Sequence, residues 1–201
     1  MRIPWFCWRI PDLYDLYYRY DHKLSRGKHK QVNPEGCHPP RRGPEVNLTE
    51  HFSLAEFCAS EVAARRGLGN TIPPELIPNA VALCENVLEP ARAVLGPIRI
   101  SSGFRSKRVN SAVGGAWGSQ HQFGQAADII PLGLNVNLFE LFEYIYESLP
   151  FDQIIWEFGA WVHVSFAPVL RHTVLVAAAV PGKQRATYTE MGPEQIAALG
   201  L

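Results

Sequence analysis

An alternating run of residues near the carboxyl end most constrains how this chain can fold. Over residues 161–166 the side chains switch regularly between two kinds of position. Trp161, His163 and Ser165 would share one face of an extended strand, since successive side chains of a strand point to opposite faces. The two valines and Phe166 would share the other face. The run therefore predicts a strand that buries its valines and turns its histidine toward a cleft.

A second polar feature lies upstream, where His121 and Asp128 stand seven residues apart with several Gly and Ala positions between them. A histidine and an aspartate at this spacing are common by chance, and a lone histidine in an apolar strand is usually a core residue. Small residues, however, let the backbone fold tightly around an ion. Together with His163 the pair forms a ligand set used by hydrolytic zinc, which keeps one position open for water. Glu157 is a separate carboxylate that could handle protons.

Several short motifs occur in a fixed order between about residue 48 and about residue 166. They are Ser101–Ser106 (SSGFRS), Asn110, Gly114–Ala116 (GGA), His121–Asp128 (HQFGQAAD) and Trp161–Ser165 (WVHVS). In this order the motifs resemble those of the zinc D-Ala-D-Ala carboxypeptidase family. That family belongs to a wider group, which also contains vancomycin-resistance D-Ala-D-Ala dipeptidases, several phage endolysins and the hedgehog signalling domain.

The resemblance implies that His121, Asp128 and His163 are zinc ligands. It implies a catalytic base less directly, because carboxypeptidase and dipeptidase relatives often place this acid three residues before the last histidine, where this chain has Ala160. The spacing of six between Glu157 and His163 is similar to the hedgehog arrangement and to many phage-type members. Glu157 is therefore the expected base.

The same resemblance makes Arg105 the cation that faces the scissile carbonyl or the substrate carboxylate. A guanidinium suits such an oxygen because it is always charged and donates hydrogen bonds in a fork. The alternative is a surface arginine in a polar turn. Arg105, Ser119 and Trp161 are expected to wall a cleft that accepts an extended peptide, with a peptidoglycan stem peptide as the substrate.

Composition permits this interpretation without selecting it. The chain of 201 residues can bury one good core, and its formal net charge of +0 provides no global attraction to nucleic acid or membrane. No apolar run reaches the roughly 20 residues of a membrane-spanning helix, and the first residues are too aromatic for a signal-peptide core. We expect a monomer, no nucleic-acid partner and no membrane span; the cellular location stays open.

The first 46 residues differ from the remainder and are expected to form an N-terminal extension and linker. Tyrosines and basic residues between 14 and 30 are followed by a loop-like stretch rich in Pro and Gly. This extension is either poorly ordered, or the product of an upstream start codon, or an arm that binds nucleic acid or a wall polymer. Residues 47–201 are the expected zinc peptidase domain. Cys58 and Cys84 are predicted to be buried free thiols, whereas Cys7 and Cys37 could form a disulfide in an oxidising compartment.

The pattern of elements predicts an α+β domain in which helices pack on a small antiparallel sheet that carries an open zinc site. Helices come first along the chain and strands gather toward its end. Helices are predicted over 53–67, 79–95 with a kink before Pro90, 106–113, 138–148 and 193–199, and strands over 97–101, 126–131, 151–157, 161–166 and 173–180.

Strand parity constrains the hairpin that joins residues 151–157 to 161–166. Glu157 can share a face with His163 only if the two residues are opposed or offset by an even number of positions. A two-residue turn would place Glu157 on the wrong face. We therefore predict an odd loop or a bulge, with Gly159 or a neighbour in an unusual backbone conformation, and Glu157 opposite His163.

Three function classes are compatible with these features. The first is a zinc peptidase that trims a terminal D-Ala or cleaves within the stem or cross-link, as an endolysin would. The second is a binding module that keeps the fold without turnover, and the third is a structural part of a phage particle. The complete set of His121, Asp128, His163 and Arg105 favours the enzyme.

Overall fold

The computed structural model describes residues 46–133, 135–179 and 186–200, which belong to one compact unit of the chain, Arg42–Leu201. The predicted extension lies, up to residue 45, outside the described residues, as do Cys7 and Cys37. The boundary at residue 46 therefore stays a prediction. Cys84 is a buried free thiol, as expected, and Cys58 is a half-buried one.

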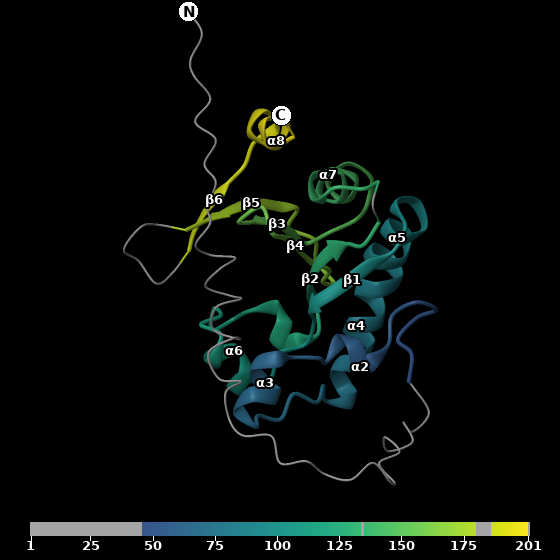
Figure 1. Cartoon of the computed structure of the whole chain (residues 1–201), viewed down its shortest axis with the longest axis vertical. Coiled ribbons are helices and arrows are strands. Elements are labelled where there is room, and N and C mark those ends of the chain that lie inside the picture. Colours follow the sequence, from purple (N-terminus) through teal and green to yellow (C-terminus); the bar gives the residue numbers. More distant parts are fainter. Residues whose placement is uncertain (1–45, 134, 180–185, 201) are drawn as a thin grey trace, which may run out of the picture. The chain divides into compact units, whose positions relative to one another are not determined.

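One sheet organises the described residues, and six strands form it in the order β1-β2-β4-β3-β5-β6 (Figure 1). Neighbouring strands run antiparallel except β3 and β5, which pair in parallel. The strands are β1 (Ile98–Ser102), β2 (Ala126–Pro131), β3 (Gln153–Glu157), β4 (Trp161–Ser165), β5 (Thr173–Ala178) and β6 (Thr187–Glu190).

The α+β class with helices on a small sheet is confirmed, and two details of the sheet differ from the prediction. The expected all-antiparallel sheet contains the parallel pair because the chain leaves β4 and crosses the end of β3 before β5 begins. Strand β6 was not predicted. Its four residues are all exposed, so it carries no alternation of apolar and polar positions.

Helices cover the side of the sheet that faces the core. Helix α7 contacts β2, β3 and β4, and a capping box of Asn137 and Glu140 begins it. Buried core residues from this layer include Phe142, Ile129 and Val162. The helices are α2 (Leu54–Phe57), α3 (Glu61–Arg66), α4 (Ile77–Leu83), α5 (Glu89–Leu95), α6 (Lys107–Ala112), α7 (Leu138–Ser148) and α8 (Pro193–Leu199), with short 3-10 turns η1 (Pro74–Leu76) and η3 (Gln120–Phe123).

Two predicted helices are interrupted. The helix expected over 53–67 is split into α2 and α3, because the Ser60 hydroxyl accepts a hydrogen bond from the Ala63 amide and begins a new helix. The helix expected over 79–95 begins earlier, at Ile77, and a π-helical segment, η2 (Cys84–Leu88), comes before Pro90. The wider turn accommodates a proline, which has no backbone N–H to donate.

The opposite face of the sheet carries polar side chains. Directly paired residues of neighbouring strands share a face, and Asp128 pairs with His163. The histidine therefore points away from the valines of β4, as the alternation predicts. In the described part of the chain, every helix is too short or too polar to cross a membrane.

Candidate metal centre

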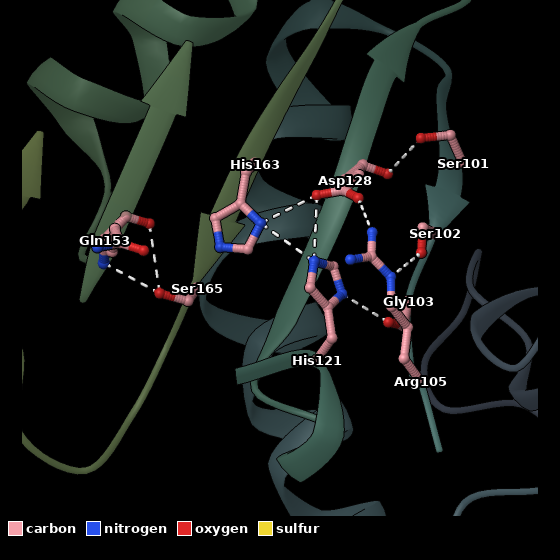
Figure 2. A network of polar contacts seen from close by, with 9 residues as sticks. All are labelled: Ser101, Ser102, Gly103, Arg105, His121, Asp128, Gln153, His163 and Ser165. Atoms are coloured by element: carbon pink, nitrogen blue, oxygen red, sulfur yellow. Dashed lines mark hydrogen bonds and ion pairs between the residues drawn. The ribbon is translucent and has the colours of Figure 1, made fainter. Parts of the chain in front are cut away.

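Three buried polar residues converge where β2, β4 and η3 meet (Figure 2). His121 Nε2 lies 3.1 Å from His163 Nδ1 and 3.2 Å from Asp128 Oδ1. His163 Nδ1 lies 2.9 Å from the same carboxylate oxygen. The register of β2 against β4 aligns Asp128 with His163, and Gly124, with φ 68°, ends η3 and turns the chain from His121 into β2.

A backbone contact determines which nitrogen of His121 is available. Its Nδ1 lies 2.7 Å from the carbonyl oxygen of Gly103, which can only accept, so Nδ1 carries the proton. The lone pair of Nε2 then points to the centre of the group. A side chain at position 103 is excluded, because a Cβ added there would meet the Phe57 carbonyl oxygen at 2.3 Å. Only glycine fits this contact.

Electrostatics keep the group in the form that binds a cation. Burial alone would raise the pKa of Asp128, but His121, His163 and Arg105 together lower that pKa well below its usual range. Burial lowers the pKa of His121, against the opposing charge of Asp128. The group thus combines an ionised carboxylate with a neutral imidazole, which are the protonation states that metal ligands need.

Arg105 lies beside this group and contacts it directly. Its Nη2 forms an ion pair with Asp128 Oδ2, and its Nε donates a 2.8 Å hydrogen bond to the Ser102 hydroxyl (Figure 2). The guanidinium therefore binds Oδ2 of Asp128, while Oδ1 of the same carboxylate faces the two histidines. The alternative of an unconnected surface arginine does not describe this residue, whose side chain is only 18% exposed.

Glu157 lies on the same sheet face as His163, but the register of β3 against β4 differs by two residues from the predicted one. The loop between β3 and β4 has an odd length, residues 158–160, as expected. Gly159 adopts φ 67°, also as expected, and Phe158 adopts φ 57°. The expected opposition of Glu157 to His163 is wrong, because Ile155 opposes His163 and Glu157 opposes Trp161. The offset of two positions still preserves the common face.

The surroundings of Glu157 favour a proton acceptor that works near neutral pH. Burial raises its pKa to about 7, and the charge of Asp128 contributes to the rise against the lowering effects of His163, Arg105 and Trp161. A carboxyl whose pKa lies near the working pH can both take and return a proton.

Besides Arg105, the two other residues expected to wall the cleft come from two different elements. Ser119 directly precedes η3, which carries His121. Trp161 neighbours Glu157 across the hairpin. The buried indole Nε1 is close enough to lower the pKa of Glu157, yet within the described residues it makes no hydrogen bond of normal geometry. The neighbouring acceptor for this buried donor is therefore the Glu157 carboxylate.

Asp152, the residue before β3, is another carboxylate that could serve as a base, but its surroundings give it a structural role. It accepts hydrogen bonds from the backbone, Nε and Nη2 of Arg171 and from Nε2 of Gln120. Burial would raise its pKa, but these hydrogen bonds lower the pKa to about 2. Such a weak base cannot take a proton at neutral pH. Gln120 and Arg171 were not singled out from the sequence, because neither belongs to a local pattern.

A zinc ion fits the donors that are present. Among the described residues, His121, Asp128 and His163 form a group whose ligand atoms all lie within 4.8 Å of one another and whose members are all buried. Two imidazoles and a carboxylate are zinc ligands, and the Gly103 carbonyl and the Arg105 guanidinium orient them from behind.

Comparison with known proteins agrees with this centre. No curated protein matches the chain. The model of one family, Peptidase M15, matches residues 50–165, which is more than half of the 201 residues and includes every member of the group. The chain therefore belongs to the peptidase M15 family of zinc-dependent metallopeptidases, and the buried cluster of His121, Asp128 and His163 is a place where it can hold its metal.

Proposed function

We propose that the protein hydrolyses peptide bonds next to D-amino acids in peptidoglycan stem peptides. The observation that carries this proposal is the convergence of His121, Asp128 and His163 on one point beside a carboxyl group whose pKa is about 7. Three protein ligands leave a position for water in hydrolytic zinc sites. The family match supports a zinc peptidase, and the resemblance to D-Ala-D-Ala carboxypeptidases supports the substrate.

In this proposal His121, Asp128 and His163 are the ligands and Glu157 is the catalytic base. Bound zinc supplies Lewis-acid chemistry, polarising the substrate carbonyl and making a water acidic enough to attack at neutral pH. Glu157 takes the proton of the attacking water and returns it to the leaving amine. Its raised pKa suits the first step, because a carboxylate with an ordinary pKa is a weaker base and would take the proton of water less readily.

Arg105 and Trp161 are assigned to the substrate, with Ser119 at the entrance. Two nitrogens of the guanidinium hold Asp128 and Ser102, and the remaining Nη1 amine is assigned to a carboxylate or carbonyl oxygen of the peptide. The part-exposed ring of Trp161, which pairs with Glu157 across the hairpin, is assigned to the other wall of the substrate cleft. The protein would then bind the peptide from both sides of the metal.

The decisive experiment incubates the zinc-loaded protein with purified peptidoglycan fragments and identifies the products by mass spectrometry. Loss of a terminal D-Ala would indicate a carboxypeptidase, and scission within the stem or cross-link would indicate an endopeptidase. Glu157→Gln is the matched control, because it keeps the shape of the side chain but cannot take a proton. The control should retain zinc and lose turnover.

Two results would refute the proposal. If elemental analysis finds no stoichiometric zinc after reconstitution, the ligand assignment is wrong. If zinc binds but the muropeptides stay unchanged, the protein is a binding module or structural protein with the same fold. Either outcome is separable from misfolding by recording the far-UV circular dichroism of the same sample.

A further inference from the structure

A row of side chains crosses the open face of the sheet and leads away from the metal group. Glu157 of β3 pairs with Trp161 of β4 on one side and with Ala177 of β5 on the other. Ala177 in turn pairs with Tyr188 of β6. Because directly paired residues share a face, all four side chains of this row point to the same side of the sheet.

The third residue of the row, Ala177, has a small side chain, so no bulky group separates Glu157 from Tyr188. Ala177 is buried and contributes only a methyl group between Glu157 and Tyr188. Adjacent strands lie about 4.8 Å apart, so two strand spacings separate the backbones of Glu157 and Tyr188 by roughly 10 Å. Tyr188 is 54% exposed, so its phenol remains accessible to a ligand lying across the strands.

The electrostatic field of the metal group reaches Tyr188. Burial raises the pKa of its phenol, the charges of Glu157 and Asp128 raise it further, and Arg105 lowers it. Asp128 is one of the assigned zinc ligands, and Arg105 contacts it directly. A phenol whose pKa is raised stays protonated at neutral pH and remains a hydrogen-bond donor.

Tyr188 comes from a part of the chain beyond the family match. The match ends at residue 165, whereas β5 begins at Thr173 and β6 at Thr187. The matched segment contributes β1 to β4 to the sheet. The pairing of β6 with β5 adds the phenol of Tyr188 to the same open face.

We propose that Tyr188 is a substrate-binding residue, whose hydroxyl donates a hydrogen bond to a carbonyl or carboxylate oxygen of the peptide lying over β3 and β5. This proposal rests on the proposed function. It places Arg105 and Tyr188 on opposite sides of the metal group, because the strand order runs from β1 through β2, β4, β3 and β5 to β6. The bound peptide would extend past Glu157 toward β6.

The test compares Tyr188→Phe with wild type on a synthetic stem peptide that the wild-type protein cleaves. The variant keeps the ring and loses only the hydroxyl. One hydrogen bond to the substrate corresponds to about a five- to tenfold rise in KM, with kcat within about twofold because the bond is made before and during the reaction alike. Zinc content and circular dichroism should match wild type.

A control on the same strand separates binding from strand stability. Thr189 pairs with Val176, so it lies on the face opposite to Tyr188. Thr189→Val should leave KM unchanged. A second measurement avoids catalysis: the same peptide is titrated calorimetrically into zinc-loaded Glu157→Gln, with and without Tyr188→Phe, and the double variant should bind about five- to tenfold more weakly.

The outcomes distinguish the two proposals. An active wild type whose KM and peptide affinity are unchanged by Tyr188→Phe would overturn the role of Tyr188 and leave the proposed function standing. An equal KM rise in Thr189→Val would assign the effect to β6 as a strand and would also overturn it. If the wild-type protein neither cleaves nor binds any stem peptide, both proposals are refuted.

Discussion

Two carboxylates at opposite ends of β3, Asp152 and Glu157, should have opposite roles, and paired amide substitutions test this. Asp152 accepts hydrogen bonds from Arg171 and Gln120 where the chain crosses from β4 to β5. Glu157 faces the metal group instead. We expect Asp152→Asn to lower the free energy of unfolding and to leave turnover nearly unchanged. We expect Glu157→Gln to abolish most of the turnover and to leave the free energy of unfolding nearly unchanged.

The magnitude for Asp152 follows from its pKa. The hydrogen bonds of Arg171 and Gln120 outweigh burial and lower this pKa from 3.8 to about 2. Each pKa unit corresponds to about 1.4 kcal/mol, so removing the charge should reduce the free energy of unfolding by roughly 2 kcal/mol. For a chain of this size that is a fall in Tm of about 4–8 °C. The Asp152 side chain is 2% exposed but that of its partner Arg171 is 53% exposed, so solvent screening at the arginine makes this value an upper limit.

The sign of the pH dependence differs between the two residues. Because the pKa of Asp152 is depressed, its contribution is complete above pH 3.8 and disappears as the pH falls toward 2. The stability difference between Asp152→Asn and wild type should vanish there. Because the pKa of Glu157 is raised to about 7, its stabilising contribution is complete below pH 4.5 and is lost as the pH rises through 7. The metal-free Glu157→Gln protein should therefore be at least as stable as wild type at pH 8.

The assay combines urea unfolding of the metal-free proteins, followed by tryptophan fluorescence, with turnover of the zinc-loaded proteins. Omitting zinc from the unfolding measurement avoids stabilisation by bound ligand. Asp152→Asn should keep kcat within about tenfold of wild type, whereas Glu157→Gln should lose about 10²- to 10⁴-fold. A fully stable Asp152→Asn protein that has lost turnover would show that Asp152 is the base and that the assignment of Glu157 is wrong.

Four further predictions concern the metal group and its support. His163→Ala should lose most of the bound zinc and the activity together, as measured by elemental analysis, and stoichiometric zinc in this variant would refute the ligand set. Arg105→Lys should lower kcat/KM by at least about tenfold with zinc and fold intact, because a point charge cannot replace the fork that holds Asp128 and Ser102; equal kinetics would contradict this role. Gly103→Ala should weaken zinc binding in a competition titration with a chelator, since the added Cβ would meet the Phe57 carbonyl oxygen at 2.3 Å and displace the acceptor of His121; unchanged affinity would show that the backbone adapts. The acid limb of the pH profile of kcat/KM should fall at or below pH 7, because burial raises the pKa of Glu157 to about 7 and a bound cation favours the carboxylate; a limb well above pH 7 would argue for another base.

Local periodicity predicted how one member of the candidate metal centre is oriented, whereas the ligand set as a whole was implied by the family resemblance. The alternation around His163 shows which way its side chain points, because strand side chains alternate whatever the strand pairs with. The same parity argument required an odd loop after Glu157, and residues 158–160 form one. Helix α7 was predicted with its observed limits, 138–148, from its amphipathic pattern, and the structure adds the capping box that begins it.

Pairing between distant segments was beyond the reach of these patterns. The register that places Asp128 opposite His163 joins strands 35 residues apart, and the parallel pairing of β3 with β5 depends on how the crossover packs. The opposition of Glu157 to Trp161 rather than to His163 depends on where the loop residues take positive φ angles. Each of these registers and pairings depends on how much apolar surface the whole sheet buries, and that free energy cannot be read from a single segment.

The sequence by itself determined which residues could bind a metal and on which face one of them would lie, because side-chain chemistry and strand parity are local properties. Only the tertiary structure decided how that chemistry is tuned. The pKa of Glu157 depends on burial and on the charge of Asp128. The lone pair of His121 is directed by a carbonyl 18 residues away, and Tyr188 joins the open face only through the pairing of β6 with β5. These effects require groups that are distant in sequence to be close in space, and folding alone brings them together.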